Sequence, residues 1–124
     1  MDIKHASFVT LPVTDQERAL AFYTGVLGFE VRADRRVGPV RWLQVAPEGA
    51  ETVFTLSGPG MGDFTPGSTR GIMLVTADVD ADCAKLVAAG VEVSGPQDAP
   101  WGRMAGFRDP DGNGLMLVTE KEGR

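Results

Sequence analysis

Cysteine, histidine and long apolar runs are scarce in this sequence, and each shortage excludes a class of protein. The 124 residues include one cysteine, Cys83, which excludes an internal disulfide and any metal site built on several cysteines. The one histidine, His5, cannot supply the two histidines of a non-haem iron site. No apolar run approaches the roughly 20 residues that a membrane-spanning helix needs. We therefore expect a soluble, cytoplasmic chain that has no membrane partner.

Positive charge is also in short supply. Twelve Lys and Arg stand against seventeen Asp and Glu, so the net charge is −5. Nucleic-acid binders display clustered basic charge, whereas the densest basic run here, residues 32–36, is interrupted by Asp34. We therefore expect no nucleic-acid partner. The acidic balance favours cationic small molecules at long range.

The first half of the chain predicts a strand, a helix and three further strands. Val9, Leu11 and Val13 alternate with other residues, as in a half-buried strand. A Thr-x-x-Glu capping box over 14–17 predicts the start of a helix, and Gly28 predicts its end. The apolar face of that helix consists of Ala19, Phe22, Tyr23, Val26 and Leu27. Further strands are expected over 29–31, about 38–46 and 51–57.

The second half repeats this order after a linker, residues 58–70, that is rich in glycine and proline. Asp78 and Gly90 bracket a second helix as Asp15 and Gly28 bracket the first, at spacings of 63 and 62 residues. Residues 109–113 predict a hairpin turn before the last strand. The alternative is that two unrelated halves share common turn signals.

We predict an α+β fold of two tandem β-α-β-β-β modules that form a curved, mostly antiparallel sheet. A single domain would cover 1–124, with module one at 1–57, the linker at 58–70, module two at 71–120 and a short tail at 121–124. Each helix would cover one face of its strands and leave the other face free.

Residues 8–15, 21–23, 27–29 and 107–113 resemble motifs of the glyoxalase / bleomycin-resistance / extradiol-dioxygenase superfamily, the vicinal oxygen chelate superfamily. The resemblance covers nearly the whole chain, from residue 3 to about residue 120. It implies two such modules around a cup that is usually completed in a homodimer. Enzymes of the family hold a divalent metal in the cup, while other members have no metal and sequester aromatic antibiotics.

The four positions that the resemblance assigns to metal ligands carry Phe8, Thr55, Gly71 and Met116. None is a good donor for a divalent cation, because three offer no hard donor and threonine is a weak neutral oxygen. His5 lies three residues before Phe8, so in a regular strand it points to the opposite face. We therefore expect no metal and no other cofactor, and no catalytic residue is identified.

The same positions predict an apolar, adaptable cup that is suited to planar ligands. Polar side chains in its lining would orient the ligand. The alternative is that these side chains fill the cup as ordinary core. The candidate ligand-binding residues are Phe8, Thr10, Trp42, Gln44, Thr55, Met73, Trp101, Arg103 and Met116.

Three functions follow from these observations. The first is bleomycin-resistance-like sequestration of a small planar or cationic molecule in a metal-free cup, which would make the protein an antibiotic-resistance factor. The second is a glyoxalase-like lyase or a dioxygenase with an atypical or absent metal site. The third is a structural or regulatory dimer with a filled cup. The resemblance, and not the composition, implies the homodimer.

Overall fold

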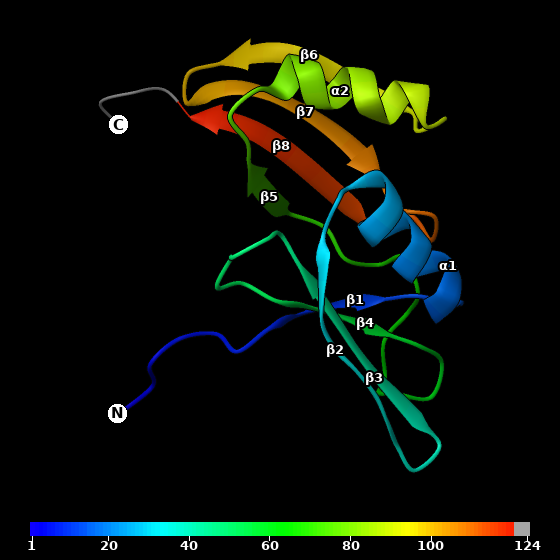
Figure 1. Ribbon diagram of the computed structural model, residues 1–124. Coiled ribbons are helices and arrows are strands. Elements are labelled where there is room, and N and C mark those ends of the chain that lie inside the picture. Colours follow the sequence, from blue (N-terminus) through cyan, green and yellow to red (C-terminus); the bar gives the residue numbers. More distant parts are fainter. Residues whose placement is uncertain (121–124) are drawn as a thin grey trace.

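The computed structural model describes residues 1–120, so the tail expected over 121–124 lies outside the described residues. The chain forms the eight strands, two α-helices and one π-helix labelled in part in Figure 1. In chain order they are β1 (Val9–Pro12), α1 (Gln16–Ala21), η1 (Phe22–Val26), β2 (Glu30–Val37), β3 (Val40–Ala46), β4 (Phe54–Ser57), β5 (Ile72–Val75), α2 (Val79–Ala88), β6 (Val93–Ala99), β7 (Gly102–Arg108) and β8 (Gly114–Glu120).

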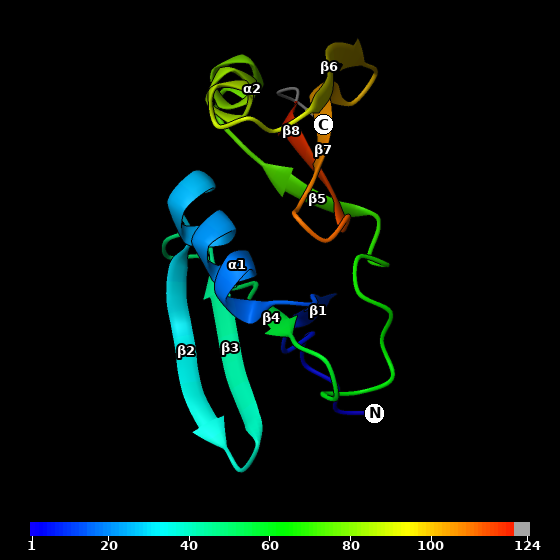
Figure 2. The same ribbon diagram turned by 90° about the vertical axis from the view of Figure 1, so that its right-hand side faces the viewer.

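The strands form two sheets with the same topology. The first sheet has the order β1-β4-β3-β2 and the second has the order β5-β8-β7-β6. In each sheet the first and last strands of the module pair in parallel and the other pairs are antiparallel. Both views show one sheet above the other, and Figure 2 shows both helices on one side and the linker on the opposite side. This identity of strand order confirms the predicted repeat.

The start of the first helix differs from the prediction. The N-cap is Asp15, whose carboxylate accepts hydrogen bonds from the backbone N–H groups of Glu17 and Arg18 at 3.0 and 3.2 Å. Thr14, the cap expected from the capping box, instead donates its hydroxyl to Asp111 at 2.6 Å. The capping box therefore predicted the position of the helix correctly but the wrong N-cap residue, because the carboxylate of Asp111, distant in the sequence, accepts the Thr14 hydroxyl.

Both predicted helix ends are confirmed. Gly28 and Gly90 have φ angles of 74° and 83°, the left-handed conformation in which glycine commonly ends a helix. Before Gly28 the helix widens into the π-helix η1, and Phe29 donates its backbone N–H to the Tyr23 carbonyl at 2.9 Å. Within residues 1–120, no helix is long and apolar enough to cross a membrane.

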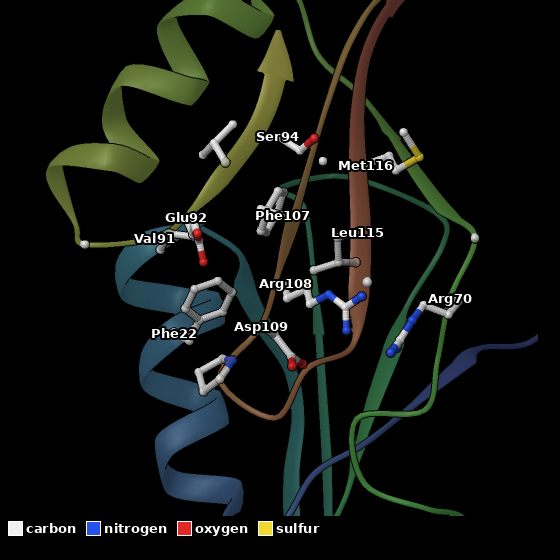
Figure 3. A pocket seen from close by; sticks show the side chains of 16 residues that line it. Phe22, Arg70, Val91, Glu92, Ser94, Phe107, Arg108, Asp109, Leu115 and Met116 are labelled. Carbon is white, nitrogen blue, oxygen red and sulfur yellow. The ribbon is translucent and has the colours of Figure 1, made fainter.

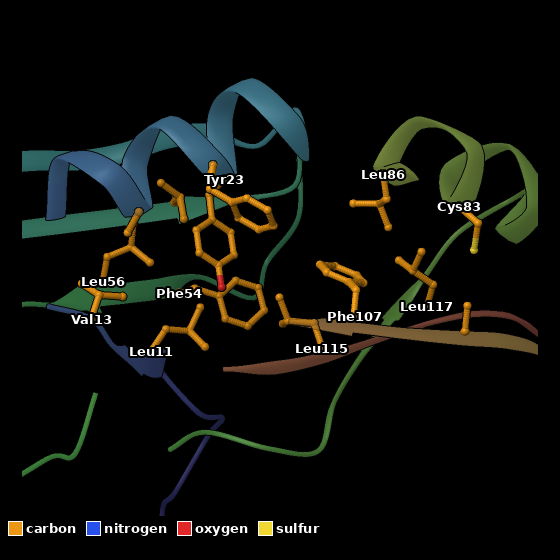
Figure 4. Packing of buried hydrophobic residues seen from close by; sticks show 14 of the residues in the cluster. Leu11, Val13, Tyr23, Phe54, Leu56, Cys83, Leu86, Phe107, Leu115 and Leu117 are labelled. Carbon is orange, nitrogen blue, oxygen red and sulfur yellow. The ribbon is translucent and has the colours of Figure 1, made fainter. Parts of the chain in front are cut away.

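One hydrophobic core lies between the helices and the faces of the sheets that they cover (Figure 4). It is continuous across the two modules, because Phe22 of η1 lies against Phe107 of β7 with ring centroids 6.4 Å apart. The strand residues of the core alternate along the sequence, as predicted. Its strand and helix members include Leu11, Tyr23, Leu43, Phe54, Leu56, Cys83, Leu86, Phe107, Leu115 and Leu117.

A polar turn between β7 and β8, residues 109–113, joins the two modules; we call it the junction turn. The Tyr23 hydroxyl, fully buried in module one, donates to Asp109 Oδ2 at 2.9 Å. Asn113 donates its side-chain amide to the Pro12 carbonyl at 2.9 Å and accepts the Thr69 backbone N–H at 3.0 Å. Burial, and then the charge of Asp109, raises the pKa of Tyr23, so the phenol stays protonated and donates. The turn thus binds both module one and the linker.

We predict that Tyr23→Phe lowers the free energy of unfolding by about 1–3 kcal/mol, because it leaves a buried carboxylate oxygen short of a donor. Urea unfolding followed by circular dichroism measures the change. Thr24→Val is the matched control, since within residues 1–120 the Thr24 hydroxyl bonds only to the Leu20 carbonyl, one helical turn earlier. Equal stabilities of Tyr23→Phe and the wild-type protein would contradict the role given to the junction turn.

Candidate functional site

The face of each sheet that points away from the helices is the candidate site; we call it the concave face. In the first sheet, Thr55 pairs in register with Thr10 on one side and with Gln44 on the other. Their neighbours Leu11 and Leu56 point into the core. Gln44 donates its side-chain amide to the Thr55 hydroxyl at 3.0 Å. Three predicted site residues therefore lie side by side on one face.

An aromatic pair lies at the edge of this group. Phe8 and Trp42 meet edge to face, with ring centroids 5.5 Å apart and an interplanar angle of 83°. Phe8 remains 39% exposed, and Trp42 is half-buried. Arg35 of β2 is the register partner of Trp42 and lies on the same face. The first concave face thus offers accessible aromatic surface beside polar side chains.

The concave face of the second sheet carries methionine. Met73 of β5 pairs in register with Met116 of β8, and Gly106 of β7 pairs with Met116 from the other side. Met73 is 44% exposed. Met116 and Gly71 also line an open cavity of about 880 Å³, shown in Figure 3. The predicted residues of module two other than Trp101 and Arg103 therefore also share one face.

The structure places Arg103 away from this face, which corrects the expectation for it. Arg103 has the same parity on β7 as the buried Ala105 and Phe107, so it points to the α2 side. Its guanidinium binds Asp80 at 2.7 and 2.9 Å and Asp98 at 3.2 Å. This hydrogen bonding lowers the pKa of Asp80. The alternation of side chains along β7, counted back from the buried Phe107, would have predicted that Arg103 points to the α2 side.

Trp101 lies in the turn between β6 and β7 and is 46% exposed. It makes no ring contact with Phe8 or Trp42, whose pair lies on the first sheet. The structure therefore does not bring Trp101 together with the other aromatic candidate residues.

Two arginines that the sequence interpretation left out line the same cavity as Met116. Arg108 has the parity of Gly106 on β7 and so lies on the concave face. Arg70 ends the linker and precedes Gly71. Figure 3 shows both side chains directed toward the start of β8. The alternation along β7 could have identified Arg108, but no sequence signal pointed to Arg70.

The side chains at the four metal-ligand positions of the family do not fit a divalent cation. Phe8 and Gly71 offer no donor, Met116 offers a soft thioether, and the Thr55 hydroxyl already accepts from Gln44. Within the described part of the chain, no three His, Cys, Asp or Glu side chains cluster closely enough to hold a metal. His5 is exposed, and its Nδ1 lies 3.1 Å from the Ala6 carbonyl.

Cys83 does not contribute a nucleophile to either concave face. It belongs to the core between α2 and the second sheet and is 6% exposed. Burial is the main cause that raises the pKa of its thiol, and nearby Asp80 and Asp82 raise it further. The thiol therefore stays in its unreactive neutral form.

Comparison with known proteins places this geometry in context. Residues 3–117 match the sequence model of the glyoxalase/bleomycin resistance protein/dioxygenase superfamily. The structure of TnmS3, an antibiotic binding protein from Streptomyces sp. CB03234, is 49% identical, with 98% of this chain and 99% of that chain covered and a TM-score of 0.88. A member of the same superfamily from Sphaerobacter thermophilus is 38% identical, with coverages of 97% and 100% and a TM-score of 0.89.

A curated relative is also similar along almost its whole length. The uncharacterized protein YetH of Bacillus subtilis is 35% identical over 117 residues, which are 93% of this chain and 98% of that protein. The similarity to these proteins therefore spans both modules and the linker between them.

We predict that millimolar Zn²⁺ or Mn²⁺ does not raise the melting temperature of the EDTA-treated protein. A cation that binds the folded state stabilises it by mass action, and the concave faces offer too few hard donors for such binding. Thermal melting with and without each cation measures the effect, and His5→Ala serves as the control for adventitious binding at the N-terminus. A rise of several degrees that survives His5→Ala would overturn this interpretation.

Proposed function

Because the chain belongs to the glyoxalase/bleomycin resistance protein/dioxygenase superfamily, we propose that it sequesters a small planar molecule without a metal. The observation that carries the proposal is the accessible Phe8–Trp42 pair on a concave face whose metal-ligand positions lack suitable donors. The similar TnmS3 is an antibiotic binding protein, which supports a role in antibiotic binding or resistance here.

The proposed ligand stacks against aromatic and thioether surface. Aromatic rings prefer offset-stacked or edge-to-face contacts, and the edge-to-face pair leaves part of each ring open to a third ring. The methionines of the second sheet adapt to the outline of the ligand. Thr10 and Gln44 supply orienting polar groups, and Thr55, which is 1% exposed, holds Gln44 in place by accepting its amide. The proposed binding residues are thus Phe8, Thr10, Trp42, Gln44, Thr55, Met73 and Met116.

A homodimer that completes the cup is part of the proposal. In a single chain, apolar side chains on both concave faces remain open, with Phe8 39% and Met73 44% exposed. A second copy would cover them by laying the concave face of one module opposite that of the other. We also propose the division of one domain into 1–57, 58–70 and 71–120, and a cytoplasmic location.

The other two functions expected from the sequence have less support. A lyase or dioxygenase needs a metal site or a paired acid and base, and the two carboxylates that line the cavity, Glu92 and Asp109, form no metal-binding cluster within the described residues. A filled cup is hard to reconcile with the exposure of Phe8 and Met73. A cationic ligand has less support, because two arginines, Arg70 and Arg108, line the cavity beside Met116, whereas its exposed carboxylate, Glu92, lies beside Val91 (Figure 3).

We predict that Trp42→Leu weakens the binding of planar two- and three-ring compounds about tenfold, because it removes the largest stacking surface. Isothermal titration calorimetry in EDTA with a panel of such compounds measures the dissociation constants. Trp101→Leu is the matched control and leaves the constants unchanged. The absence of binding by the wild-type protein across the panel would contradict the proposed function.

We predict a mass in solution of twice the 13.2 kDa chain. Met73→Lys places a charge on the exposed concave surface and shifts the mass toward one chain. Val87→Lys, on α2 and 61% exposed, is the matched control and leaves the dimer intact. Size-exclusion chromatography with light scattering measures all three. A single-chain mass for the wild-type protein, or equal shifts for both variants, would contradict the proposed dimer.

A further inference from the structure

We infer that Arg70 and Arg108 form an anion-binding subsite on the concave face of the second sheet and that the planar ligand carries a carboxylate. This inference rests on the proposed function and deepens it by naming the chemical class of the ligand. It assigns a role to two side chains that the sequence interpretation left unused.

The two arginines lie side by side around Gly114. Arg108 is the register partner of Gly114, so its side chain leaves the sheet on the same face as a Cβ at Gly114 would. A Cβ at Gly114 would lie 2.9 Å from Arg70 Cδ, which shows that the Arg70 stem crosses over this glycine. The guanidinium groups therefore share one end of the cavity (Figure 3).

Backbone carbonyls fix Arg70 without neutralising it. Its Nη1 donates to the carbonyls of Gly67, Thr69 and Gly112 at 2.6, 2.8 and 2.9 Å. Nη1 is the one guanidinium nitrogen of Arg70 with a hydrogen bond to a described residue, so Nε and Nη2 have donors left for a ligand. The guanidinium is thus held in place and keeps its positive charge.

Arg108 makes no side-chain hydrogen bond or ion pair with any residue in the described range 1–120. Four other arginines of this acidic chain do pair with carboxylates, namely Arg18, Arg32, Arg41 and Arg103. Neither carboxylate nearest in sequence to Arg108 pairs with it, although the buried Oδ2 of Asp111 has no partner among the described residues. Asp109 accepts from Tyr23 and Asn113, and Asp111 accepts from Arg18 and Thr14.

Two like charges at neighbouring positions repel, and this repulsion opposes folding. Because the protein keeps these two like charges beside a cavity despite their repulsion, we assign them a role in binding a ligand and not in stabilising the fold. A carboxylate between the guanidinium groups would cancel the repulsion and accept charge-assisted hydrogen bonds from both. The arrangement is therefore complementary to an anion.

The surroundings select a flat, apolar anion. Gly71, Gly106 and Gly114 line the cavity beside the arginines, and none of them carries a side chain. The carboxylate of Glu92 also lines the cavity, but Figure 3 shows it beside Val91 and Phe22, away from the two arginines. Met116 borders the three glycines. An aromatic ring lying on them would present an in-plane carboxylate to the guanidinium groups, whereas a bare inorganic anion would leave this apolar surface uncovered.

The test compares 2-naphthoate with 2-naphthalenemethanol, which share a ring system and differ in charge. Isothermal titration calorimetry in EDTA gives the dissociation constants for the wild-type protein, for Arg108→Met and for Arg103→Met. The control variant removes the same charge from the same strand, but on the helix side. Arg108→Gln repeats the measurement with a polar replacement, so that the result does not depend on one variant folding.

We expect the wild-type protein to bind 2-naphthoate roughly tenfold more tightly than the alcohol. Arg108→Met and Arg108→Gln weaken the binding of 2-naphthoate about tenfold and so abolish that preference, whereas Arg103→Met preserves it. Equal binding of acid and alcohol by the wild-type protein would overturn the subsite but leave the proposed function standing. Binding of neither would overturn both. Equal losses in Arg108→Met and Arg103→Met, or full competition by inorganic phosphate, would overturn the carboxylate assignment.

Discussion

The rest of the structure depends on the hydrogen bonds that the buried carboxylate of Asp109 accepts. Its Oδ1 accepts the backbone N–H groups of Asp111, Gly112 and Asn113 at 2.9–3.0 Å, and its Oδ2 accepts from Tyr23 and Asn113. A carboxylate that is only 5% exposed is tolerable because both oxygens are bonded. The bonds shape the junction turn and tie it to module one. Since Arg108 precedes this turn and Gly114 follows it, the turn also sets the geometry of the concave face beside them.

In both modules, alternate side chains along each strand serve different purposes, one set stabilising the core and the other forming the proposed binding surface. One set of side chains packs under the helices into a continuous core, and the other set forms the two concave faces. The same topology thus yields different surfaces, one with an aromatic pair and polar groups and one with methionine, glycine and arginine. A pair of such faces suits a ligand that has one apolar ring surface and one polar end.

Local patterns were sufficient to predict the elements but not the contacts between them. The alternation at Val9, Leu11 and Val13 and the glycines that end the helices located the elements correctly, because these signals act over a few residues. The exchange of cap from Thr14 to Asp15 depends on Asp111, which only the folded chain brings near. Long-range contacts of this kind leave no trace in local spacing.

Prediction of the site was limited by strand register. The orientation of Arg103 follows from alternation along β7, but the register of β6 against β7 shifts between Ser94 and Gln97, which local spacing does not reveal. The approach of Arg70 to Gly114 depends on the path of the linker, for which the sequence indicates only turns. The sequence therefore indicated that Thr10, Gln44 and Thr55 share one face of the first sheet, but it did not indicate the approach of Arg70 to Gly114.

The most direct test of the central claim is the nitrogen–proton NMR spectrum of the protein in EDTA during titration with 2-naphthoate. The account predicts that the indole N–H signal of Trp42 shifts saturably while that of Trp101 stays in place. Shifts of neither signal, or a shift of Trp42 that requires an added divalent cation, would contradict metal-free binding at the concave faces.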